Sequence, residues 1–152
     1  MVPLDNIKEQ LFDVCRQHVD ERIFHLQETM RNTQDAVKDE SKSSVGDKYE
    51  TTRAMLHLEN EQHAIQLNEA LKLKKTLDLL PRTNFASVQP GALVNTSQGH
   101  FFFSISIGKI TLAKKQYFAA SIASPIGQAF INKTKGDSIL FKSINYKIKG
   151  IQ

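Results

Sequence analysis

Two carboxylates, Asp47 and Glu50, are the residues whose types and spacing could do chemistry. They follow a predicted helix break over residues 41–46, which separates two long stretches of helix-compatible sequence. Carboxylate oxygens are the ligands that hard cations such as Mg²⁺ prefer. We therefore expect both acids at the far end of a helical hairpin, where they could enter a cavity closed to the rest of the protein.

The same pair has a purely structural interpretation. An Asp at a helix N-cap with a Glu three residues later forms an acidic capping box, which stabilises the start of a helix by about 1 kcal/mol. The two roles are compatible, because a cap fixes the geometry that a metal ligand needs. Nearby, Tyr49 and Arg53 could contact a partner or simply be solvated.

Two long helices are predicted to position this tip. Neither Gly nor Pro interrupts the first stretch before Gly46, and its apolar residues recur every three to five positions. They are Leu4, Ile7, Leu11, Val14, Val19, Ile23, Leu26, Met30 and Val37. The second stretch, residues 47–80, carries Met55, Leu58, Ile65, Leu71 and Leu77 and ends at Pro81. Each helix would extend roughly 50 Å, and we expect an antiparallel coiled coil that buries both apolar stripes.

After Pro81 the apolar period changes from about 3.6 to 2, which indicates a β domain. We predict a coiled-coil domain over 1–81 and a small antiparallel sheet domain with one short helix over 82–152, so the fold class is α+β. A hairpin is expected over 101–112 with its turn at Gly108-Lys109, followed by strands at 116–120 and 138–148. Ser124 and Pro125 predict the cap and first residue of the short helix, which would bury Ile126, Phe130 and Ile131.

Charge is divided unequally between these two parts. The 152 residues carry a net charge of +4, but residues 1–81 balance to −4 and residues 82–152 to +8, with Asp137 as the one acid of the second part. A basic domain favours nucleic acid or an acidic protein surface as its neighbour.

Other reactive side chains do not form a pattern. Cys15 is the one cysteine, which excludes an internal disulfide and a Cys-rich zinc site, and we expect it to be a buried structural thiol. The five histidines are scattered, and His18 and His25 are expected on a helix seam or surface rather than at a metal. The single cysteine and the lack of a charged-then-apolar leader favour the cytoplasm. No apolar run is long enough to cross a bilayer, so we expect no membrane partner.

The residues resemble one known family. A long helical hairpin with Gly46-Asp47-Lys48-Tyr49-Glu50 at its tip, followed by a β domain with Ser124-Pro125-Ile126-Gly127-Gln128-Ala129 and Gly136-Asp137, resembles the bacterial Gre transcript-cleavage factors. The resemblance in layout spans nearly the whole chain and implies an FKBP-like C-terminal domain. After Glu50, where the family has Asn-Ala-Glu-Tyr, this chain has Thr51-Thr52-Arg53-Ala54.

The resemblance implies a function in trans. The coiled coil would enter the secondary channel of RNA polymerase, and Asp47 and Glu50 would help hold a second Mg²⁺ and an attacking water there, so that the polymerase cleaves backtracked RNA. Asp47 would be the main metal ligand, and Glu50 would position or deprotonate the water. The chain would be an accessory factor without an active site or bound cofactor of its own. RNA polymerase and nascent RNA would be its partners, contacted in part by Tyr49, Arg53, Ser124 and Pro125, and we expect a monomer.

The sequence also fits two other functions. A channel-binding regulator could use the same shape without promoting cleavage, and an unrelated coiled-coil adaptor could share the hairpin. A prolyl isomerase is not expected. The lysines of the second domain could form a solvated face, or some could approach RNA; Lys114 and Lys115, beside Tyr117 and Phe118, could suit a nucleic-acid strand.

Overall fold

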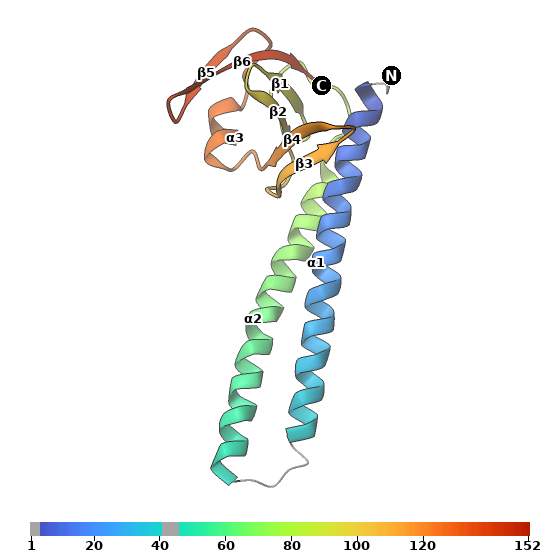
Figure 1. Ribbon diagram of the computed structural model, residues 1–152, viewed down its shortest axis with the longest axis vertical. Coiled ribbons are helices and arrows are strands. Elements are labelled where there is room, and N and C mark those ends of the chain that lie inside the picture. Colours follow the sequence, from blue (N-terminus) through green and yellow to red (C-terminus); the bar gives the residue numbers. More distant parts are fainter. Residues whose placement is uncertain (1–3, 41–45) are drawn as a thin grey trace. The chain divides into compact units, whose positions relative to one another are not determined.

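The computed structural model describes residues 4–40 and 46–152, and the side chains of residues 7–39 and 50–152. Two long helices, α1 (Leu4–Glu40) and α2 (Gly46–Leu79), precede a six-stranded sheet and one short helix (Figure 1). The later elements are β1 (Leu93–Thr96), β2 (Gly99–Phe103), β3 (Gly108–Leu112), β4 (Lys115–Ala120), α3 (Pro125–Phe130), β5 (Ser138–Phe141) and β6 (Ile144–Ile151). The predicted α+β class is confirmed.

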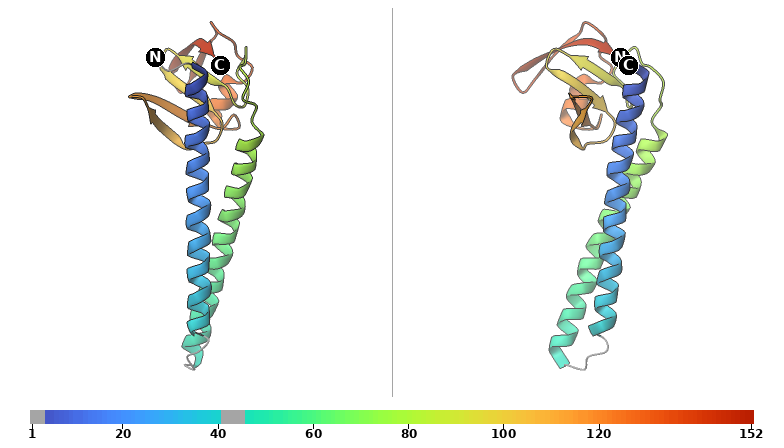
Figure 2. Two further views of the ribbon diagram at one scale, coloured as in Figure 1. Left: turned by 90° about the vertical axis from the view of Figure 1, so that its right-hand side faces the viewer. Right: turned by 45° about the vertical axis from the view of Figure 1, so that its right-hand side comes forward.

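Helix α1 forms as its sequence predicts. It runs for 37 residues without Gly or Pro, and its predicted apolar stripe is buried or half-buried wherever its side chains are described. Helix α2 lies beside it in both views of Figure 2 and runs in the opposite direction. The Lys74 ammonium and the Asp20 carboxylate, 2.8 Å apart, link the two helices.

The buried face of α2 is not the predicted one. Met55, Leu58, Ile65 and Leu71 were expected in the seam, but Met55 is 60% and Ile65 62% exposed. Only Leu77 of the predicted stripe is buried, at 1%. The described residues of α2 that are buried or half-buried are Thr52, Leu56, Asn60, His63, Leu67, Ala70, Leu73, Lys74 and Leu77. The predicted set is spaced by three, six or seven residues and the buried set mostly by three or four. Both spacings fit a helical repeat, so periodicity alone does not decide which face packs.

The six strands form one sheet in the order β3-β4-β2-β1-β6-β5. Strands β2 and β4 are parallel, whereas the other pairs are antiparallel. The prediction of a purely antiparallel sheet is therefore wrong for this one pair. Strand β1 was not predicted. Strand β4 matches the strand predicted over 116–120.

The hairpin predicted at Gly108-Lys109 is wrong. Strand β2 ends at Phe103, and the chain continues inward through the buried Ser104 and Ile105 instead of turning back. Strand β3 then pairs with β4 through a tight turn at Ala113-Lys114, where φ is 49° and 65°. Two successive residues with positive φ are typical of a type I′ turn, which usually contains Asn-Gly. Because this turn consists of Ala and Lys, its residue types did not reveal it.

The strand predicted over 138–148 is in fact a second hairpin, β5–β6. Its turn at Lys142-Ser143 also has positive φ at both residues, 48° and 67°. The turn brings Ile139 opposite Tyr146 and Phe141 opposite Ile144. Again the sequence lacks the usual glycine, which hid the turn.

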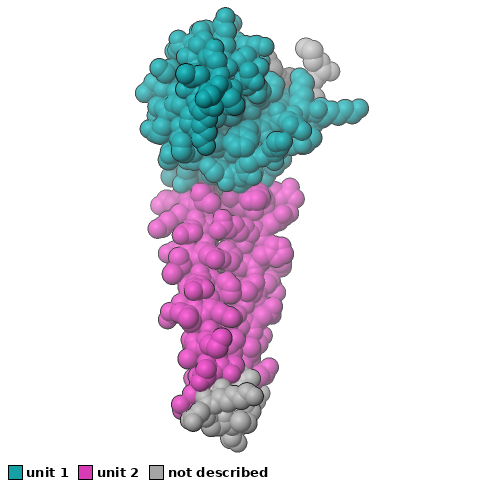
Figure 3. Space-filling model, turned by 60° about the vertical axis from the view of Figure 1, so that its left-hand side comes forward, with its two compact units in different colours: residues 1–16, 76–152 teal, residues 17–75 magenta. Residues whose placement is uncertain are grey.

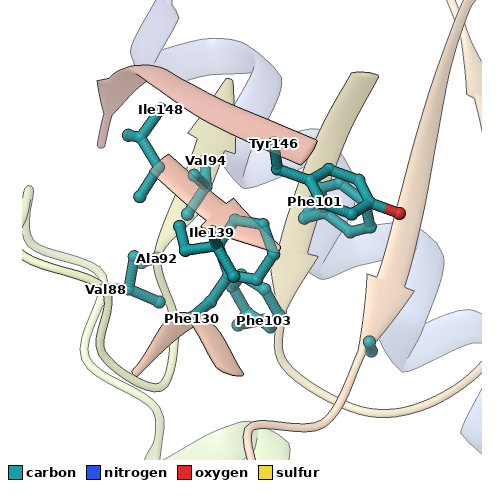
Figure 4. Packing of buried hydrophobic residues seen from close by; sticks show 10 residues of the cluster. Val88, Ala92, Val94, Phe101, Phe103, Phe130, Ile139, Tyr146 and Ile148 are labelled. Atoms are coloured by element: carbon teal, nitrogen blue, oxygen red, sulfur yellow. The ribbon is translucent and has the colours of Figure 1, made fainter. Parts of the chain in front are cut away.

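Helix α3 and the sheet enclose the core of the β domain. The Ser124 hydroxyl caps α3 as predicted, accepting a hydrogen bond from the Gly127 backbone N–H at 3.2 Å. Phe130 is fully buried, whereas Ile126 and Ile131 are only half-buried. Figure 4 shows Phe130 and Phe103 together in this cluster, which also contains Val88, Ala92, Val94, Phe101, Ala120, Ile139, Tyr146 and Ile148.

The chain divides into two compact units (Figure 3). One comprises residues 1–16 and 76–152, and the other comprises residues 17–75 of the helical hairpin. The first residues of α1 therefore belong with the sheet: the Phe12 ring packs edge-on against Phe102, with ring centroids 5.0 Å apart. None of the described helices is both long enough and apolar enough to span a membrane.

Candidate functional site

The two predicted acids lie at the start of α2. Asp47 is the second residue of the helix and Glu50 the fifth, and this spacing of three places them on one side of the helix. The side chain of Glu50 is exposed. The side chains of Asp47 and Tyr49 lie outside the described residues, and so do residues 41–45 of the break predicted over 41–46. The last residue of that break, Gly46, is already part of α2.

Helix α2 begins at Gly46, one residue earlier than the capping prediction requires. Asp47 is therefore inside the first turn rather than at the N-cap. Acids in a first turn still interact favourably with the positive end of the helix dipole, by about 0.3–1 kcal/mol. Helix stabilisation by this pair is thus compatible with its backbone position.

The donor set at this site suits Mg²⁺ only as a shared ion. Carboxylate oxygens are the ligands that Mg²⁺ prefers, but two carboxylates fill only part of its octahedral shell. Within the described residues, no group of three or more His, Cys, Asp or Glu side chains could hold a metal. A metal at Asp47 and Glu50 would therefore need further ligands from a partner.

Arg53 is exposed and follows Tyr49 by four residues, so the two positions share one side of α2. They were predicted as partner contacts together with Ser124 and Pro125, which lie in the sheet domain. The Ser124 hydroxyl donates to the Ser121 carbonyl at 2.5 Å besides accepting from Gly127. Its role in the fold is thus to begin α3, and Pro125 is exposed at the first turn.

The predicted basic pair Lys114 and Lys115 is exposed. Lys114 occupies the β3–β4 turn, and Lys115 begins β4. The adjacent Tyr117 and Phe118 point to opposite faces of the sheet, since side chains alternate along a strand. Both residues nevertheless line one cavity of about 350 Å³.

Tyr117 instead pairs with His100 of β2, with ring centroids 5.1 Å apart. Burial lowers the pKa of His100, and the nearby Lys115 ammonium lowers it further. Burial also raises the pKa of the Tyr117 hydroxyl. Both shifts favour the uncharged forms of these side chains.

Cys15 is fully buried, as predicted, with its Sγ 3.6 Å from the Ser104 hydroxyl oxygen. Burial raises the pKa of the Cys15 thiol and outweighs the opposite effect of this hydrogen bond. A thiol with a raised pKa is a poor nucleophile at neutral pH, so Cys15 is not a catalytic candidate.

Three histidines that looked scattered in the sequence line one cavity of about 440 Å³ in the hairpin unit. His18 and His25 come from α1 and His63 from α2. The His63 Nδ1 atom is buried without a hydrogen-bond partner among the described groups. Sequence reasoning missed this group because the predicted seam of α2 was the wrong face.

The fold and these positions define an α+β protein that joins a helical hairpin with acids at the start of its second helix to a basic six-stranded sheet domain. No family model matches the chain, and no curated protein matches it in sequence. A similar solved structure is that of GreA factor homolog 1 (Gfh1) of Thermus thermophilus. The sequence identity is 14%, the alignment covers 93% of this chain and 94% of that one, and the TM-score is 0.35.

Proposed function

We propose that this chain is an accessory factor that binds in the secondary channel of RNA polymerase and stimulates the polymerase's own cleavage of backtracked RNA. One observation carries the proposal: two acids spaced by three residues occupy the start of the second helix of a long hairpin. The residue-level resemblance of 46–50 and 124–129 to the Gre factors points to the same activity.

The hairpin is long enough to hold its far end well away from its base. Helix α2 contributes residues 46–75 to the hairpin unit, a length of about 45 Å at the usual rise per residue. A slender pair of helices can carry a side chain into a channel that a globular domain cannot enter. The protein would act wherever the polymerase acts, which in a bacterium is the cytoplasm.

In this proposal each acid has its own role. Asp47 would share a Mg²⁺ with ligands of the polymerase, and the exposed Glu50 would orient the attacking water and accept its proton. When bound, a second Mg²⁺ would supply stabilisation of charge on the reacting oxygens. The chain would not be an enzyme by itself, because its two carboxylates complete a site that belongs to the polymerase.

Substitution of Asp47 by Asn tests this role. Asn keeps the size of the side chain but removes the charge that a metal needs, so we expect loss of transcript cleavage in a stalled elongation complex. The melting temperature should change little, because the dipole interaction contributes at most about 1 kcal/mol. Asp39→Asn, an exposed acid near the end of α1, is the matched control and should cleave normally. Cleavage at the wild-type rate by Asp47→Asn would eliminate the catalytic role.

A channel-binding regulator that does not promote cleavage is the second candidate. The observation that favours it is Thr51-Thr52-Arg53-Ala54, which stands where the Gre factors have Asn-Ala-Glu-Tyr. This candidate predicts that the wild-type protein copurifies with RNA polymerase but leaves stalled complexes uncleaved.

A coiled-coil adaptor is the third candidate. It is favoured by the exposed apolar residues Met55, Leu58 and Ile65, which lie on a face of α2 other than its buried one. An adaptor of this kind would not be retained by RNA polymerase, so copurification separates it from both channel-binding candidates.

A further inference from the structure

One face of the β domain combines an exposed aromatic ring with lysine and amide side chains. Phe118 of β4 is 40% exposed, although it lies beside Phe101 of β2 with ring centroids 5.9 Å apart. On the edge strand β3, Lys109 is directly opposite Phe118, and Thr111 is opposite Gln116. Residues opposite each other in a ladder point to the same face, so Lys109, Gln116, Phe118 and Phe101 share one surface.

This surface is hollowed. A cavity of about 350 Å³ is lined by Phe101, Lys109, Gln116, Phe118, Ile126 and Tyr146, among others. The Tyr146 ring packs edge-on against Phe101, with centroids 5.6 Å apart, and Figure 4 shows these two rings together at one end of the core cluster. The lining is thus mainly aromatic and includes the Lys109 ammonium and the amides of Gln98 and Gln116.

A second cavity adjoins the first. It has a volume of about 360 Å³ and shares Phe118 and Ile126 with the first cavity. Its other walls include Phe141 and Lys142. The two cavities together form a groove with Phe118 at its middle and one lysine in each half, Lys109 and Lys142.

Charge and shape together point to one class of ligand. Residues 82–152 contain nine basic side chains and one acid, Asp137, whose carboxylate accepts hydrogen bonds from the Thr134 backbone N–H and hydroxyl. None of the ion pairs found among the described residues involves Lys109 or Lys142. A positive groove with an exposed aromatic ring is how proteins bind unpaired nucleotides, whose bases stack while cations hold the phosphates.

We propose that this groove binds single-stranded RNA, with a base stacked on Phe118 and the flanking phosphates held by Lys109 and Lys142. The amides of Gln98 and Gln116, which line the first cavity, can exchange hydrogen bonds with ribose 2′-hydroxyls that DNA lacks. The proposal does not depend on the proposed function, because the groove lies within the sheet domain and needs no polymerase.

Fluorescence anisotropy with the full chain and a labelled oligouridine of about 12 nucleotides tests this directly. We expect saturable binding that weakens as salt is added. Lys109→Gln should weaken binding severalfold and lower the dependence on log[salt] by about 1. Phe118→Leu, which keeps an apolar side chain against Phe101, should weaken binding about tenfold.

Lys147→Gln is the matched control for charge. Lys147 lies opposite Ser138 in the β5–β6 ladder and points away from the face of Tyr146. The Lys147→Gln variant should therefore bind RNA as tightly as the wild type. Equal losses in Lys109→Gln and Lys147→Gln, or unchanged affinity in Phe118→Leu, would overturn the groove assignment. Equally tight binding of oligothymidine would overturn the assignment to RNA. All these measurements are made without polymerase, so they succeed or fail independently of transcript cleavage.

Discussion

At the residue scale, Gly127 shows how a motif residue can be required by packing. A Cβ atom at this position would lie 2.4 Å from the Ser121 carbonyl oxygen and 2.5 Å from that of Ile122. Both contacts are with backbone, which cannot move aside as a side chain would. Part of the Ser-Pro-Ile-Gly-Gln-Ala signature therefore reflects the close approach of α3 to the preceding loop.

This contact predicts a large effect of one methyl group. Gly127→Ala should lower the free energy of unfolding by about 2 kcal/mol or more, because backbone must shift to relieve the overlap. Gly150→Ala is the control, since a Cβ there meets no atom within 4 Å. Urea unfolding of both variants measures the difference, and equal stabilities would contradict the packing role.

His100 predicts a pH dependence of stability. Because its pKa in the folded state is below the ordinary value of 6.5, the unfolded chain binds more protons in the range between the two values. Stability should therefore fall as the pH drops through about 6.5 and level off below the folded-state pKa. Thermal melts from neutral to mildly acidic pH measure this slope.

His100→Gln should flatten the slope, whereas His57→Gln, on the exposed surface of α2, should keep it. A wild-type slope in His100→Gln would show that other groups produce the effect.

At the element scale, α2 carries two apolar faces, and only one of them packs. Substitution of Met55 or Ile65 by Gln should leave stability within about 0.5 kcal/mol of the wild type, because both side chains are exposed. Leu77→Ala should cost about 2–5 kcal/mol, since Leu77 is buried. Urea unfolding distinguishes this arrangement from the one that periodicity predicted, in which Met55 and Ile65 would be as costly to replace as Leu77.

At the scale of the whole molecule, the sheet domain is completed by residues from the other end of the chain. Phe12 is fully buried against Phe102, and the Arg82 guanidinium lies 4.3 Å from the centroid of the Phe12 ring. The compact unit accordingly includes residues 1–16 as well as 76–152. The boundary predicted between residues 81 and 82 stays a prediction. Substitution of Phe12 tests whether the start of α1 folds together with the sheet domain.

Phe12→Ala should lower the free energy of unfolding by about 3–5 kcal/mol, because it opens a cavity beneath the sheet. Phe24→Ala is the matched control: the same ring on the same helix is 60% exposed and should have little effect. If Phe12→Ala melts like Phe24→Ala, the start of α1 does not contribute to the stability of the sheet domain.

The sequence by itself determined the features that depend on local chemistry. The uninterrupted period of α1, the stop at Pro81 and the Ser124-Pro125 start of α3 all follow from preferences of neighbouring residues, and the structure has each of them. The acids at the start of α2 were found in the same way, because a helix break followed by acids is a local signal.

Only the tertiary structure decided what depends on distant partners. It showed which face of α2 packs, that β3 pairs with β4 rather than β2, and that Phe118 and Lys109 share a hollow surface. Two faces of a helix, or two candidate strands, can satisfy the same period equally well. The choice between them depends on burial against residues far away in the chain, and that free energy is not contained in any local stretch of sequence.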